Sequence, residues 1–385
     1  MLSLATLAGV GGMMESGYSM NGPGSMVGTI AIMMAIVTVH ECGHFIAARS
    51  QGIRVSKFAI GFGPSLITTK RDDVEYSLRL IPLGGYVAFP EDMPTEDDQA
   101  PVFDPEDPDL LKNRSVPERA LVISAGVLAN IIFAYTALLL QVGTVGKAII
   151  DYEPGVRLPD IVRGTAAERC GLQDNDVLMQ IDEWNVPASS RQVSDVVHRI
   201  KMSGGREMEF IVQRGGERIM IPCAPDRLSD GSGRIGVQVF SNSQVDHIKA
   251  RSFSDAIMIS TEEFSRLSNL VLDGLFKIFT NFSKVAGQLS GPVAIVAAGT
   301  EIAKTDAAGL FQFCAIVNIN LAVVNVLPLP ALDGGYLALL VLEALRGGKK
   351  LPVEFEKGFM ASGFLLLTAM GMGLIVRDTF NLISH

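Results

Sequence analysis

Four long apolar segments dominate the pattern of hydrophobic and polar positions along the chain. They cover, approximately, residues 26–48, 119–145, 309–327 and 358–376. Each approaches the roughly 20 residues that an α-helix needs to cross a bilayer. The third contains three asparagines, which we expect to face the bundle interior because amide groups are costly against lipid; a buried helix of a soluble core is the alternative for this segment. The pattern predicts a multi-pass α-helical membrane protein with about four transmembrane helices.

A different pattern follows the first apolar segment. Residues 55–67 and 74–89 alternate apolar and polar side chains and include several glycines, which predicts a membrane-associated β-hairpin region. Residues 91–109 are acidic and rich in proline, which is typical of a mobile linker.

The pattern becomes that of a water-soluble domain between residues 151 and 244. Short β-type runs at 177–181 and 208–213 flank a helical stretch near 190–201. The segment from Gly164 to Asp182, GTAAERCGLQDNDVLMQID, resembles the PDZ family, although Asn175 stands where that family usually has glycine. Asparagine also accepts a positive φ. The resemblance implies an inserted α+β PDZ-like domain that binds an extended peptide as an added strand; a β-rich spacer without a ligand is the alternative.

Two further segments complete the organisation. Residues 251–281 place apolar side chains at helical spacing, so we expect an amphipathic helix that lies on the membrane surface or braces the bundle. Residues 287–299 are rich in glycine and alanine, which favours close helix packing. These features divide the chain into an N-terminal segment (1–25), a first membrane part (26–150), a PDZ-like domain (151–244) and a second membrane part (245–385).

Composition and charge narrow the class of protein. The chain is 48% hydrophobic and 19% charged, with a net charge of -9 and a mean hydropathy of +0.32. The negative charge argues against nucleic acid as a partner, because binding a polyanion needs a basic surface. Four scattered cysteines without a CxxC pair predict neither a disulfide framework nor a cysteine zinc site.

The sequence HECGH at positions 40–44 closes the first apolar segment. On a helix His40 and His44 lie one turn apart on nearly the same face, so both imidazoles can bind one Zn²⁺. Glu41 is close enough to take a proton from a water at the metal. Two ordinary helix histidines are the alternative, but two of the chain's five histidines at ligand spacing beside a bilayer-length segment favour zinc.

A third ligand must come from elsewhere, because catalytic zinc usually has three protein ligands and an open position. Asp333 follows the third apolar segment in the run NVLPLPALDGG, which begins at Asn325. Its prolines would break a helix at membrane depth, where free backbone is tolerated only beside a cavity. A simple turn is the ordinary interpretation of Asp-Gly-Gly alone.

Together these motifs resemble the site-2 protease family of intramembrane zinc metalloproteases, peptidase family M50. In that family a HExxH motif in one span pairs with the aspartate of an Asn-Pro-Pro-Leu-Asp-Gly motif near another. The resemblance implies zinc ligation by His40, His44 and Asp333, a general base at Glu41, and substrate positioning by Asn325, Pro328 and Pro330. The segment SAGVLAN in the second apolar segment lacks the family's common proline, so the roles of Gly126 and Asn130 stay open.

The predicted function is therefore intramembrane zinc endopeptidase activity on the transmembrane segments of other proteins in the lipid bilayer. A zinc-activated water would attack the scissile carbonyl after the substrate helix has unwound. The glycine-rich β-region, with Gly85 and Tyr86, would hold the unwound strand. A noncatalytic membrane adaptor with a structural metal and a transporter are the alternatives.

Three tracts bear on location. SKFAIGFGP, LLKNRS and LEALRGGKKLP resemble the branch of this family found in cyanobacteria and plastids. That resemblance implies a chloroplast membrane, with a bacterial inner membrane as the alternative.

Overall fold

The computed structural model describes residues 23–92, 106–281, 291–305 and 309–383. Most of the predicted N-terminal segment and of the acidic linker, and the start of the glycine-rich stretch at 287–299, lie outside the described residues. The chain divides into two compact units, one formed by residues 1–147 and 248–385 and the other by residues 148–247. Each unit is treated separately below.

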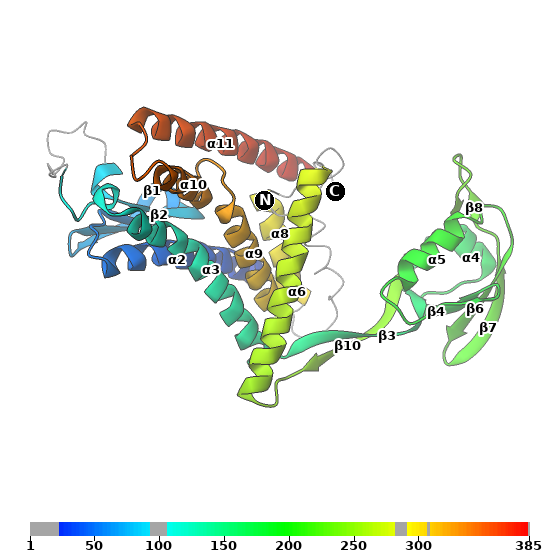
Figure 1. Cartoon of the computed structure of the whole chain (residues 1–385). Coiled ribbons are helices and arrows are strands. Elements are labelled where there is room, and N and C mark those ends of the chain that lie inside the picture. The colour runs from blue at the N-terminus through cyan, green and yellow to red at the C-terminus, as the bar shows by residue number, and fades with distance from the viewer. Residues whose placement is uncertain (1–22, 93–105, 282–290, 306–308, 384–385) are drawn as a thin grey trace. The chain divides into compact units, whose positions relative to one another are not determined.

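The first unit is mostly helical (Figure 1). Its helices are α2 (Pro23–Ser50), α3 (Val116–Thr144), α6 (Phe253–Thr280), α8 (Pro292–Thr305), α9 (Gly309–Val326), α10 (Asp333–Leu345) and α11 (Val353–Ile383), with short 3-10 turns at Pro90–Asp92 and Leu111–Asn113. Four described segments, 24–50, 116–144, 309–326 and 353–377, are long and apolar enough to cross a membrane. The prediction of a multi-pass helical membrane protein with about four spans is confirmed. The separate helices α8 and α10 were not predicted.

Helix α9 lies at the centre of this unit. Phe313 and Ile316 of α9 are fully buried and belong to one apolar cluster with Ile36 of α2, Leu138 of α3 and Leu267 of α6. The amphipathic helix predicted for 251–281 therefore braces the bundle through α6.

Two of the three asparagines of α9 have the inward orientation expected for polar groups in this span, and Asn320 is only partly buried. Asn318 and Asn325 are buried, and Asn318 Nδ2 donates to Cys314 O one turn earlier. This bond within the helix gives the NH₂ group of Asn318 a partner, whereas its Oδ1 has none among the described residues.

The predicted β-hairpin is present as β1 (Lys57–Arg71) and β2 (Val74–Ala88). Bulges fold the pair so that residues 57–60 lie beside both 75–78 and 85–88. Since residues 85–88 pair only with 57–60 among the described residues, they form an edge of this sheet. That edge lies next to α2, because a side chain added at Gly85 would come within 2.9 Å of Glu41 Cγ.

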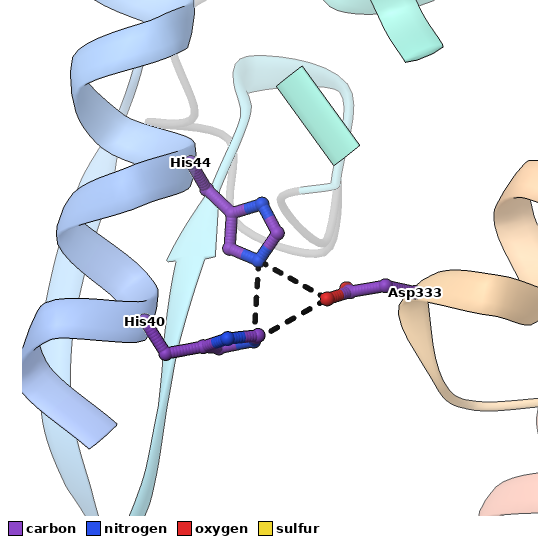
Figure 2. A group of neighbouring side chains, drawn as sticks. All are labelled: His40, His44 and Asp333. Carbon is purple, nitrogen blue, oxygen red and sulfur yellow. Dashed lines mark hydrogen bonds and ion pairs between the residues drawn. The ribbon is translucent and has the colours of Figure 1, made fainter. Parts of the chain in front are cut away.

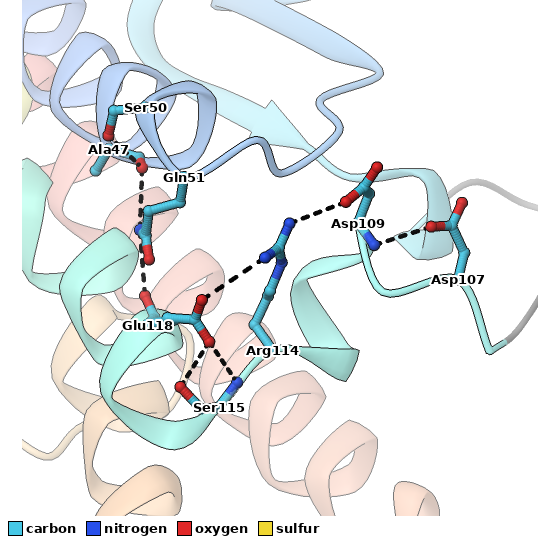
Figure 3. A network of polar contacts seen from close by, with 8 residues as sticks. All are labelled: Ala47, Ser50, Gln51, Asp107, Asp109, Arg114, Ser115 and Glu118. Atoms are coloured by element: carbon cyan, nitrogen blue, oxygen red, sulfur yellow. Dashed lines mark hydrogen bonds and ion pairs between the residues drawn. The ribbon is translucent and has the colours of Figure 1, made fainter.

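A polar network joins the end of α2 to the start of α3 (Figure 3). Gln51 Nε2 donates to Ala47 O and, at 3.5 Å, to Glu118 O. Ser115 caps α3 in a capping box with Glu118, and Arg114 pairs with both Glu118 and Asp109. These contacts fix where α3 begins beside the last turn of α2.

The second unit is a sheet with two helices. Its strands are β3 (Lys147–Leu158), β4 (Asp176–Ile181), β5 (Trp184–Asn185), β6 (Met208–Arg214), β7 (Glu217–Cys223), β8 (Asp226–Arg227), β9 (Gly233–Arg234) and β10 (Phe240–Ile248), and its helices are α4 (Ala166–Cys170) and α5 (Gln192–Lys201). The main sheet has the order β10-β3-β4-β6-β7, with β5 paired to β4. Leu158, Leu178 and Phe210 are fully buried in its core.

Two local features of this unit bear on the sequence predictions. Asn175 has a φ of 69°, a positive value that asparagine accepts. Cys170 and Cys223 form a disulfide, so the prediction that the cysteines make none was wrong. The two residues are 53 positions apart, and only the fold brings the end of α4 beside β7.

Candidate metal centre

Three side chains from two helices converge on one point in the first unit (Figure 2). His40 and His44 project from α2, and Asp333 is the first residue of α10. His40 Nε2 and His44 Nε2 are 3.3 Å apart, and Asp333 Oδ2 lies 3.3 Å from the first and 3.4 Å from the second. The residues predicted from the two separated motifs are therefore in contact.

This triangle has the dimensions of a tetrahedral zinc site. Zinc binds imidazole nitrogen and carboxylate oxygen at about 2.0–2.1 Å, so two ligands at the tetrahedral angle are about 3.3–3.4 Å apart. All three measured edges match. Asp333 Oδ2 is buried and faces the two imidazole nitrogens, which is how a carboxylate ligand would be placed. The donor set and its geometry fit Zn²⁺.

The opposite nitrogens of the two imidazoles contact α3. His44 Nδ1 lies 2.9 Å from Val122 O, to which it can donate a hydrogen bond. His40 Nδ1 lies 3.1 Å from the amide of Asn130. Such outer contacts orient histidine ligands and leave Nε2 free for a metal. The structure thus places Asn130, whose role the sequence left open, directly behind a predicted ligand.

Glycines allow the elements of the site to approach this closely. A side chain added at Gly126 of α3 would overlap the His44 ring and come within 2.8 Å of His40 Cε1. One added at Gly43 of α2 would collide with the Ala125 carbonyl, and one at Gly334 with the carbonyls that end α9. Position 126 has no room for a methyl group, so it requires glycine. The sequence motif alone could not show this requirement.

A cavity of about 500 Å³ opens onto the three ligands. Glu41 lines it and is only 8% exposed, and the edge-strand residues Gly85 and Tyr86 and the α9 residue Asn325 line it as well. Pro328 and Pro330 are not among the described residues that line the cavity. They lie in the turn between α9 and α10.

The charged end of the same cavity was not predicted. Arg119 of α3 and Glu343 of α10 form a buried ion pair there, with Nη2 and Oε1 2.5 Å apart. The pair links the helix behind the histidines to the helix that carries Asp333. Nothing in the sequence spacing of these two residues, 224 positions apart, indicates it.

Comparison with known proteins agrees with this geometry. The model for peptidase family M50 matches residues 28–370. The chain is 46% identical over 368 residues to "Membrane metalloprotease ARASP, chloroplastic" of Arabidopsis thaliana, an alignment that covers 95% of this chain and 81% of that one. It is 41% identical over 363 residues to "Putative zinc metalloprotease all3971" of Nostoc sp., covering 94% and 97%. It is 28% identical over 424 residues to "Regulator of sigma-W protease RasP" of Bacillus subtilis, covering 89% and 96%.

Proposed function

The chain belongs to peptidase family M50, and from this membership we propose that it is an intramembrane zinc endopeptidase that cuts the transmembrane segments of other membrane proteins. The observation that carries the proposal is the triangle of His40 Nε2, His44 Nε2 and Asp333 Oδ2, whose edges equal those of a tetrahedral zinc site. It lies beside a buried glutamate and within a bundle of apolar helices.

Each residue of the site has a proposed role. His40, His44 and Asp333 hold the zinc, which when bound supplies a Lewis acid that lowers the pKa of water and polarises a carbonyl. Glu41, buried in the same cavity, accepts a proton from the attacking water and returns it to the nitrogen that leaves. The amide of Asn325 faces the cavity and donates a hydrogen bond to the substrate backbone. Pro328 and Pro330 act indirectly, by shaping the turn that brings Asp333 to the histidines.

The substrate has to present an extended backbone, because a helix keeps its carbonyls in its own hydrogen bonds. The edge formed by residues 85–88 is the element suited to hold such a backbone by strand addition. Gly85 lies against Glu41 and Tyr86 lines the cavity, so a strand added there would pass the catalytic glutamate.

Replacing Glu41 by glutamine tests the mechanism. The change keeps the size of the side chain and leaves all three ligands in place, so zinc content measured by mass spectrometry should stay at the wild-type level. Cleavage of a tagged single-span reporter with glycine and proline in its membrane helix should be lost. Cys42→Ala is the matched control. Cys42 is the next residue of the same helix, but it packs against the apolar cluster that contains Ala48 and Phe58 and does not line the cavity. Cleavage retained by Glu41→Gln would refute the proposed role of Glu41.

For the second unit we propose a PDZ-like peptide-binding role. In support, α4 is followed by Gly171 with a φ of 87° and by Asn175 with a φ of 69°, and then by β4, which agrees with the order of the motif. In the full chain, replacement of residues 151–244 by a glycine-serine linker should abolish binding of a library of unstructured peptides while zinc content is unchanged. Equal peptide binding by both proteins would exclude this role.

The similarity to chloroplastic and cyanobacterial relatives supports a plastid membrane as the location of this multi-pass protein. A fluorescent fusion followed through plastid fractionation tests it. Recovery of the fusion in another membrane would exclude it.

A further inference from the structure

Asn130 is a fully buried polar residue whose own hydrogen bonding is incomplete. Its side chain is 0% exposed on α3. Nδ2 lies 3.1 Å from His40 Nδ1, whereas Oδ1 is buried without a hydrogen-bond partner among the described residues. An unmade hydrogen bond at a buried amide oxygen is costly. Gln141 Oε1 and Asn318 Oδ1 are also buried without a partner among the described residues, but the amide of Asn130 contacts a proposed metal ligand.

The position of the proton on His40 bears on how the Asn130 amide is oriented. His40 directs Nε2 toward His44 and Asp333, so Nε2 is the atom available to a metal. A neutral imidazole that uses Nε2 as a ligand carries its proton on Nδ1. Nδ1–H is then a donor, and an amide NH₂ group facing it would place donor against donor.

A half turn of the amide removes the donor-against-donor contact. The oxygen and nitrogen of an asparagine amide occupy nearly the same space, and their assignment follows from hydrogen bonding. With Oδ1 toward His40, the Nδ1–H group gains an acceptor at about the same 3.1 Å separation, and the buried oxygen gains its partner.

We propose that Asn130 is a positioning residue of the metal centre, whose Oδ1 accepts the Nδ1–H hydrogen bond of His40 and so fixes the tautomer and ring orientation that zinc binding needs. His44 has the equivalent bond to a main-chain carbonyl, that of Val122. Helix α3 therefore holds one ligand by its backbone and the other by a side chain. The inference rests on the zinc ligation by His40 proposed above.

A second asparagine provides an internal contrast. Asn325 Nδ2 lies 3.3 Å from Nε2 of His40, which is the nitrogen that would bind the metal. Its contact is therefore given up when the site is loaded, whereas that of Asn130 is kept. Truncation of Asn130 should weaken zinc binding, and truncation of Asn325 should not weaken it but should lower turnover.

The test measures zinc affinity of the full chain by chelator competition in detergent. Asn130→Leu, which has no acceptor, should bind zinc 10- to 100-fold more weakly, in the range found for outer contacts of histidine ligands. Asn130→Asp keeps an acceptor and has no NH₂ group, so it should escape this loss and bind zinc more tightly than Asn130→Leu. Wild-type affinity in Asn130→Leu, or an Asn130→Asp variant as weak as Asn130→Leu, would overturn the proposal.

Two further measurements keep the result interpretable. His40→Ala should itself lower zinc affinity, and if it does not, the failure lies with the proposed metal site and not with Asn130. Because a buried aspartate can impair folding, the Nδ1–H group of His40 is also observed in the zinc-loaded wild-type protein by nitrogen-15 NMR of labelled histidine, with His40→Gln to assign the signal. A hydrogen-bonded Nδ1–H is expected, and an Nδ1–H signal that Asn130→Leu leaves unchanged contradicts the inference.

Discussion

Asp176 in the second unit and Asp333 in the first are both buried carboxylates, but their surroundings differ. Asp176 is fully buried, and its two oxygens accept from Arg214 Nε and Nη2 at 2.8 Å each and from the Gln173 backbone NH at 2.9 Å. Among the described residues, Asp333 Oδ2 faces two imidazole nitrogens and has no further polar partner. Asp176 has its hydrogen bonds satisfied within its own unit. Asp333 and the two imidazoles instead surround a point at which a metal ion could bind.

The difference separates a structural ion pair from a binding site. The hydrogen bond with Asp176 raises the pKa of the Arg214 guanidinium, an effect that burial opposes. Asp333 is oriented by the turn between α9 and α10, and its partners lie on α2, nearly 300 residues away along the chain. Buried polar groups that converge without satisfying one another indicate function more strongly than burial alone.

The largest expected effect follows from removing Asp333. In Asp333→Ala, zinc affinity should fall by roughly 10²- to 10³-fold, because apparent zinc-binding free energies of about 10–16 kcal/mol are shared among some four ligands. Cleavage of the single-span reporter should be lost with it. Zinc content and reporter cleavage are measured on the same preparation. Full zinc content in this variant would remove Asp333 from the site.

A smaller loss is expected from adding one methyl group at Gly126. The new Cβ of Gly126→Ala would overlap the His44 ring, so the ring must move and turnover should fall on the order of 10²-fold, the usual cost of a displacement near 1 Å. Zinc affinity should fall with it. Gly143→Ala on the same helix is the control, because nothing lies within 4 Å of its added methyl group. That change should leave turnover intact and stabilise the helix by up to about 1 kcal/mol. Equal activities of the two variants would show that α2 and α3 do not have to pack this closely.

Sequence reasoning predicted the proposed ligands but not the residues that support them. The HExxH pair, Glu41 and Asp333 were predictable because zinc chemistry requires particular side chains, and the four spans because bilayer thickness sets their length. The need for glycine at position 126 and the contact of Asn130 depend on the distance between two helices. A single sequence contains no such distance.

The same limit explains what was missed in the fold. Helix α10 follows two prolines and begins at Asp-Gly-Gly, a run that predicts only a turn. The Cys170–Cys223 disulfide has no local spacing signal, since its residues meet only when α4 packs beside β7.

Breaking that disulfide should affect the second unit alone. Closing a loop of this length stabilises a domain by about 4 kcal/mol in the chain-entropy model, and 2–4 kcal/mol is typical. Cys170→Ser should lower the free energy of unfolding of this unit by about 2–4 kcal/mol, as measured by denaturant titration. Its zinc content should not change. Cys42→Ala, which alters a free cysteine, is the control.

A thiol count checks the bond directly. The wild-type chain, denatured without reductant, should show two reactive thiols of its four cysteines. Four thiols would contradict the bond, and so would a Cys170→Ser stability equal to that of wild type.

The smallest expected effect returns to Asp176. In Asp176→Ala the guanidinium of Arg214 loses its carboxylate partner, but it keeps its hydrogen bond to Gly171 O, and its side chain is 28% exposed and can reach water. The cost should therefore be about 2–3 kcal/mol, below the 3–5 kcal/mol typical of fully buried pairs. It would appear as a loss of unfolding free energy in the second unit, with wild-type zinc affinity. The double variant Asp176→Leu with Arg214→Met should recover part of this loss, because no charge is then left unpaired. A fall in zinc affinity in Asp176→Ala would show that the two carboxylates are energetically linked, and the contrast between a structural and a functional aspartate would fail.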